Sequence, residues 1–160
     1  MKKFFKLSLM TIVAFFATIA VSCSKDDDIN GDNNSGLKFN NTSVGKILSA
    51  VCEEGHLQGE YWISFSSNFF YDGSVTPFDI TVPIKSVSQL KEGQELTNKV
   101  DLIVFDYYQK SYEAEGSLKV KKITNSGITL QFKNFSFIIS HGSQVGQEYV
   151  VNGLITYDLN

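Results

Sequence analysis

The chain has 160 residues and a formal net charge of −3, and all 14 of its basic residues are lysines because arginine is absent. Nucleic-acid binding needs clustered positive charge, and arginine is the side chain that grips a phosphate through two parallel hydrogen bonds. This composition therefore argues against a nucleic-acid partner. The length suits one domain with a substantial core.

The first 22 residues have the layout of an export signal. Lys2, Lys3 and Lys6 form a positively charged start, and residues 7–21 are apolar or small and carry no charge. A transmembrane helix needs about 20 apolar residues, and the segment that follows here is acidic rather than basic. We interpret residues 1–22 as a signal peptide that is removed.

Cys23 follows directly on the small residues Ala20 and Ser22, which is the position of the acylated cysteine in a lipoprotein signal. We expect Cys23 to become the lipid-carrying first residue of the mature protein. The alternative is cleavage by ordinary signal peptidase, which would leave Cys23 as a thiol able to pair with Cys52 in an oxidising compartment.

Residues 22–28, Ser-Cys-Ser-Lys-Asp-Asp-Asp, resemble the start of surface lipoproteins from Bacteroidota. In that group a basic residue followed by acidic ones, here Lys25, Asp26, Asp27 and Asp28, resembles the signal for export to the outer face of the outer membrane. The resemblance thus implies a lipid-anchored, surface-exposed location. The strand pattern of the C-terminal half is also similar to that of small lipoproteins of this group. A solvated tether is the other interpretation of the same charges.

Residues 23–36 contain a single aliphatic side chain, Ile29, apart from the cysteine, and cannot repay the entropy of folding. We interpret them as a flexible acidic tether. Removal of residues 1–22 takes three lysines and no acid, which leaves a net charge of −6.

From Leu37 onward, apolar residues recur with period two between turn signals, which is typical of an antiparallel sheet. Residues 44–51 fit helical spacing, but Gly45 weakens a helix, so we expect a strand there. Ser86-x-x-Gln89 has the form of a capping box and predicts one helical turn ending near Gly93. The other expected strands are residues 60–65, 78–84, 100–108, a hairpin over 118–132 around Asn125–Gly127, 135–139 and 149–159.

Two details refine this pattern. Pro83 cannot donate to a strand ladder, so we expect its strand at a sheet edge. The buried phase changes between Phe132 and Phe135, which predicts a β-bulge at residues 133–134. We predict an all-β fold, an antiparallel β-sandwich of about seven strands with a small β-barrel as the alternative, in a single domain over residues 37–160.

The residues that could carry chemistry do not form a known catalytic or metal-binding pattern. Asp26, Asp28 and Asn30 match the start of a calcium loop, but Leu37 stands where a bidentate glutamate is required. Cys52 and His56 could suggest a metal or nucleophile pair, yet only His141 is left to assist, so a buried cysteine and a solvated loop histidine are favoured. Glu113 and Glu115 are interpreted as a solvated strand face rather than a glycosidase pair. We predict no catalytic residue, no metal and no cofactor.

Aromatic residues are dense in two stretches, one around residues 61–71 and one containing Tyr107, Tyr108 and Tyr112. We expect most of these rings in the core. The exceptions are Trp62, which alternates with the buried face of its strand, and Phe69, Phe70 and Tyr71, which lead into a turn. Exposed rings beside Asp or Asn can stack on sugars, so these four residues are the candidate glycan-binding platform. The alternative is that they cover a second layer of the sandwich.

Taken together, the sequence favours a non-catalytic surface lipoprotein that serves as a binding or interaction module, with a glycan or a protein as partner. A hydrolase acting on envelope or dietary glycans is one alternative. A structural envelope or fimbrial subunit with an open strand edge is another.

Overall fold

The computed structural model describes residues 36–160. The predicted signal peptide, the lipidation site Cys23, the export signal Lys25 to Asp28 and the partial calcium-loop match lie outside the described residues. No helix in the described part of the chain is long and apolar enough to cross a membrane.

Strands account for most of residues 36–160, and the only helical elements there are two 3₁₀ turns, η1 (Val87–Gln89) and η2 (Thr97–Lys99). The strands are β1 (Lys38–Phe39), β2 (Thr42–Ser43), β3 (Ile47–Leu57), β4 (Glu60–Tyr71), β5 (Ser74–Val82), β6 (Leu102–Phe105), β7 (Gln109–Ser111), β8 (Glu115–Ile123), β9 (Gly127–Ile138) and β10 (Glu148–Leu159).

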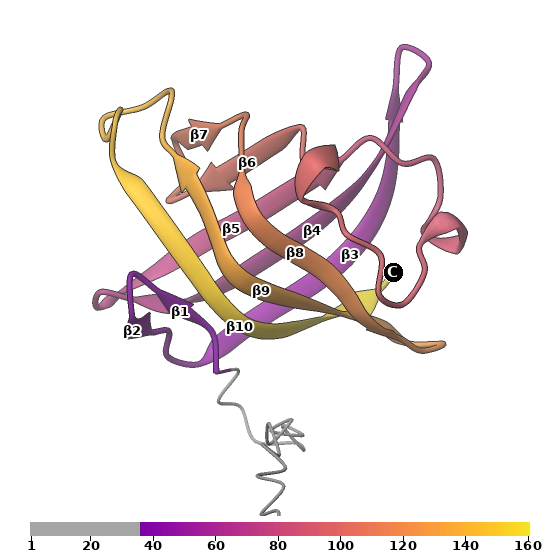
Figure 1. The fold of residues 1–160 in the computed structure, drawn as a ribbon, viewed down its shortest axis with the longest axis horizontal. Coiled ribbons are helices and arrows are strands. Elements are labelled where there is room, and N and C mark those ends of the chain that lie inside the picture. The colour runs from indigo at the N-terminus through magenta and orange to yellow at the C-terminus, as the bar shows by residue number, and fades with distance from the viewer. Residues whose placement is uncertain (1–35) are drawn as a thin grey trace, which may run out of the picture.

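All of these strands belong to one curled sheet with the order β2-β1-β10-β3-β4-β5-β6-β7, and β9 pairs with both β10 and β8. The pairs are antiparallel except β10 with β3, which run parallel and are in register at Asp158–Val51 and Leu159–Cys52. Figure 1 shows β8, β9 and β10 facing β3, β4 and β5, so that the sheet forms a half-barrel. The prediction of an all-β fold is confirmed.

Aromatic side chains fill the space between the two halves of the sheet. Phe39 stacks on Phe105 with ring centroids 5.2 Å apart and meets the edge of Phe78 at 5.1 Å. Phe137 stacks on Tyr149 at 5.6 Å. Each buried aromatic ring removes a large apolar area from water, and these offset and edge-on arrangements are the favoured ones. Because rings occupy the interior, the rim of the half-barrel is the place to search for a ligand site.

The predicted bulge at residues 133–134 is confirmed. Phe132 and Phe135 are both buried although they are three positions apart, and the register of β9 with β10 shifts between Val151 and Gly153. Asn134 has a φ of 47°, and asparagine tolerates this left-handed conformation better than most residues. The bulge therefore returns the second half of β9 to the same buried face.

The structure corrects two details and confirms two others. Pro83 lies just after β5, and β5 pairs with β4 and β6, so this strand is inside the sheet rather than at an edge. The predicted strand over 100–108 is shorter, because only Leu102–Phe105 form β6. The strand expected over 44–51 is present from Ile47 onward. A helical turn does follow Ser86, whose hydroxyl accepts from Ser88 N, but it ends at Leu90 rather than near Gly93.

Candidate functional site

The four residues of the predicted aromatic platform do not form one exposed surface. Phe69 is fully buried, and Tyr71 is half-buried with its ring 5.6 Å from that of Phe39. Phe70 is 43% exposed. Trp62 is half-buried and lies over Gly55, where an added Cβ would overlap the indole ring. Phe69 and Tyr71 therefore belong to the core packing.

The two members with more exposed rings are also far apart. Trp62 and Phe70 lie near opposite ends of β4, eight residues from one another. At a rise of about 3.3 Å per residue, roughly 26 Å separates them along the strand. A single sugar ring cannot contact both.

The most exposed aromatic residues lie instead in the second stretch, whose rings we expected mainly in the core. Tyr107, Tyr108 and Tyr112 are 60%, 80% and 48% exposed. The first two form the turn after Phe105, the last residue of β6, and Tyr112 follows β7 directly. Asp106, a frequent turn residue, is the signal in the sequence that could have placed a turn here.

The β6–β7 turn holds its backbone in an uncommon conformation. Asp106 and Tyr107 have φ angles of 52° and 59°, in the left-handed region that bulky side chains rarely adopt. Such a conformation costs of order 1–2 kcal/mol at a residue other than glycine.

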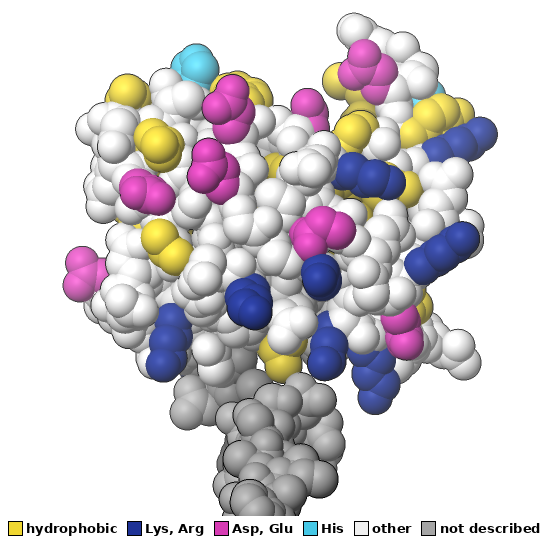
Figure 2. Space-filling view, in the orientation of Figure 1, with side chains coloured by type: hydrophobic (Ala, Val, Ile, Leu, Met, Phe, Trp, Pro, Cys, Tyr) yellow, Lys and Arg dark blue, Asp and Glu magenta, His cyan; other side chains and the backbone are white. Residues whose placement is uncertain are grey.

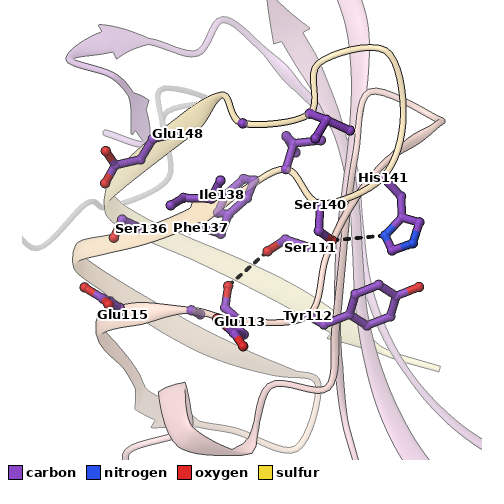
Figure 3. A pocket seen from close by; sticks show the side chains of 14 residues that line it. Ser111, Tyr112, Glu113, Glu115, Ser136, Phe137, Ile138, Ser140, His141 and Glu148 are labelled. Atoms are coloured by element: carbon purple, nitrogen blue, oxygen red, sulfur yellow. Dashed lines mark hydrogen bonds between the residues drawn. The ribbon is translucent and has the colours of Figure 1, made fainter.

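A cavity of about 570 Å³ opens beside Tyr112. It lies between the segment 111–115, which links β7 to β8, and the end of β9 with the loop that follows (Figure 3). Its apolar wall includes Tyr112, Phe137, Ile138 and Val145. Ile138 and Val145 are 56% and 63% exposed, so the cavity is open to solvent on that side.

Hydrogen bonds fix the loop 139–147 against β7. The buried side chain of Gln109 donates to Ser143 Oγ at 2.9 Å and accepts from the Gln144 N–H at 3.0 Å. Tyr149 Oη donates to Gln144 Oε1 at 2.6 Å. The backbones of Lys110 and His141 also pair. These contacts give the rim of the cavity a defined shape.

Acidic side chains surround the cavity. Glu113, Glu115 and Glu148 line it, and all three are exposed. Glu113 precedes β8 and Glu115 begins it, so they do not share the interior of one strand. His141 also lines the cavity, where its Nδ1 shares a hydrogen bond with Ser140 Oγ at 3.1 Å and its ring meets Tyr112 edge-on at 5.5 Å. In Figure 2, acidic and apolar side chains lie side by side on the upper left of the surface.

Cys52 and His56 do not combine into a reactive pair. The Cys52 thiol is buried in the core, and this burial, with smaller contributions from the charges of Glu54 and Glu53, raises the pKa of Cys52 to about 12. His56 is exposed and packs its ring 4.9 Å from that of Tyr61. Residues 36–160 contain no group of three or more His, Cys, Asp or Glu side chains arranged to hold a metal ion.

The sequence matches no family model, and comparisons with curated proteins and with solved structures find no significant match.

Proposed function

We propose that this protein is a lipid-anchored protein of the outer membrane, exposed at the cell surface, whose β domain binds a glycan without changing it chemically. The single observation that supports glycan binding best is the exposed ring of Tyr112 in the apolar wall of the cavity. Tyrosine rings bury the apolar face of a sugar, and their hydroxyls supply directional hydrogen bonds.

The proposed site has the rigidity that recognition of a weakly apolar ligand needs. Gln109 and Gln144 link β7 to the loop 139–147, so little order has to be gained on binding.

Binding of a panel of plant, bacterial and host oligosaccharides, measured by array and then by calorimetry, tests the proposal. Loss of a central aromatic contact commonly costs more than about 2 kcal/mol, so Tyr112→Ala should weaken binding by more than about tenfold. Phe70→Ala is the matched control, because Phe70 is an exposed ring at a distance from the cavity. Equal loss in the control, or no binding by the wild type, would contradict the proposal.

The anchor is tested separately. Radiolabelled palmitate should enter the wild-type protein and not Cys23→Ala. Replacement of Asp26, Asp27 and Asp28 by alanine should reduce digestion by protease added to intact cells, because these charges are proposed to direct surface export. An unlabelled wild-type protein that is soluble in the periplasm would refute the anchor.

A glycan hydrolase is the second candidate, and one observation favours it: three glutamates line the same cavity. Binding without catalysis fits better, because no hydrogen bond from another described side chain orients the carboxylate of Glu113, Glu115 or Glu148. Release of reducing ends from a bound oligosaccharide, and its loss in Glu113→Gln, would establish the hydrolase instead.

A further inference from the structure

The charged side chains that line the cavity are almost all negative. Glu113, Glu115 and Glu148 come from the β7–β8 connection, the start of β8 and the start of β10, yet they line one opening (Figure 3). Lysine is absent from the residues that line the cavity, and His141 is its one basic group. A ligand that enters therefore meets negative charge from several sides.

The ion pair between Lys119 and Glu95 involves no residue that lines the cavity. Several like charges around one opening raise the concentration of positively charged ligands there.

The apolar wall of the cavity can contact the uncharged part of such a ligand. Tyr112, Ile138 and Val145 keep between 48% and 63% of their surface exposed at the opening. An aromatic ring attracts an ammonium group as well as a sugar face, because its π-electrons carry negative charge. Apolar contact and positive charge can thus be recognised at the same place.

We propose that this cavity selects glycans that carry free, protonated amino groups and rejects glycans that carry carboxylate or sulfate groups. The inference rests on the proposed glycan-binding function and specifies the chemistry of its ligand. The sugar rings contact the apolar wall that includes Tyr112, and their ammonium groups are attracted by Glu113, Glu115 and Glu148 at the opening.

Two oligosaccharides that differ only in acetylation test the selectivity. Glucosamine pentamer and its fully N-acetylated counterpart share one backbone, and only the first carries positive charge under mildly acidic conditions. Calorimetry on the purified mature protein, at one pH for both ligands, should show at least tenfold tighter binding of the free amine. Galacturonic acid pentamer, the carboxylated probe, should bind least. The preference should shrink when added salt shortens the Debye length from about 30 Å to about 8 Å.

Two double variants with the same change in net charge separate the site from the overall charge of the protein. Glu115→Gln with Glu148→Gln should reduce the preference to less than about threefold. Glu60→Gln with Asp72→Asn should leave it intact, because these exposed residues lie in the β3–β4 and β4–β5 hairpins. Melting curves of both variants check that each is folded.

The outcomes of these experiments distinguish the amine preference from glycan binding itself. Equal affinity for the free and the acetylated pentamer overturns the amine preference and leaves glycan binding standing. The same loss of preference in the two double variants also overturns it, because the effect would then come from total charge. Binding of no oligosaccharide at all refutes the proposed function, and the amine preference with it.

Discussion

The backbone N–H of Leu118 donates to the carboxylate of Glu95 at 2.8 Å, across the outer edge of β8. Ser117 Oγ and Thr97 Oγ1 donate to the same carboxylate, at 2.8 and 2.7 Å. Backbone hydrogen bonds from Gly93 N to Val120 O and from Leu96 N to Leu118 O run beside it. Glu95 thereby holds the irregular segment 93–97 against the edge of β8. Without this segment, the edge of β8 would be open to pairing with another chain.

Glu95 should make stability depend on pH. Burial raises the pKa of this carboxyl, but the hydrogen bonds from Thr97, Ser117 and Leu118 outweigh that effect, so its pKa in the folded protein is lowered. A lowered folded pKa stabilises fully above the unfolded value of about 4.3, and the contribution is lost as pH falls through the folded pKa. In urea titrations, wild type should lose more stability between neutral pH and acid than Glu95→Gln. An equal loss in both proteins would contradict the assignment, and Glu60→Gln serves as control.

Gly116 should tolerate no side chain. Its φ is 80°, and a Cβ would overlap the carbonyl group of Asn134 in the bulge of β9. Gly73 has a similar φ of 79° but open space around it, so the pair separates strain from collision. We expect Gly73→Ala to cost about 1–2 kcal/mol and Gly116→Ala clearly more, measured by chemical denaturation. Equal losses of stability in the two variants would show that the bulge of β9 moves to make room for the added methyl group.

Two tyrosines should respond in opposite ways to loss of the hydroxyl. Tyr157 is fully buried, and its hydroxyl has no hydrogen-bond partner among the described residues. Tyr149 bonds to Gln144. Tyr157→Phe should leave stability unchanged or raise it by up to about 1 kcal/mol, and Tyr149→Phe should lower it by about 1 kcal/mol. A clear loss in Tyr157→Phe would reveal a bonded hydroxyl.

The Cys52 thiol should react only when the domain opens. With its pKa raised to about 12, the thiolate fraction at pH 8 is of order 10⁻⁴, and the side chain is also covered. In Cys23→Ala, labelling of Cys52 by a thiol reagent should be slow in buffer and rapid in denaturing urea. Rapid labelling of the folded protein would show that the end of β10 leaves β3 readily.

Much of the sheet could be predicted from the sequence because alternation along a strand reports burial directly. The change of phase between Phe132 and Phe135 even located the bulge, since only an extra residue can keep both rings inside. The position of Pro83 could not be read in this way. Whether a proline lies within a strand or just after it depends on which neighbours pair, and that is decided by residues far along the chain.

The candidate site was harder to predict for a related reason. Tyrosine occurs both in cores and on surfaces, and the exposure of Tyr107 and Tyr108 depends on β6 ending at Phe105. The cavity exists because the loop 139–147 is bonded to Gln109, more than thirty residues earlier. Conversely, Phe69 looked like a surface residue near a turn, but β4 continues to Tyr71 and carries it into the core.

The two ends of the domain face different ways. Gly36 and Leu37 pass closely over Gly153, at the lower end of Figure 1, whereas β7 and the loop 139–147 lie at the upper end. With the anchor at Cys23 as proposed, the tether joins the domain at the end away from β7 and the loop 139–147, so the attachment point leaves that end uncovered. Several copies could then hold one polysaccharide chain together, so that modest individual affinities add up to firm retention through avidity.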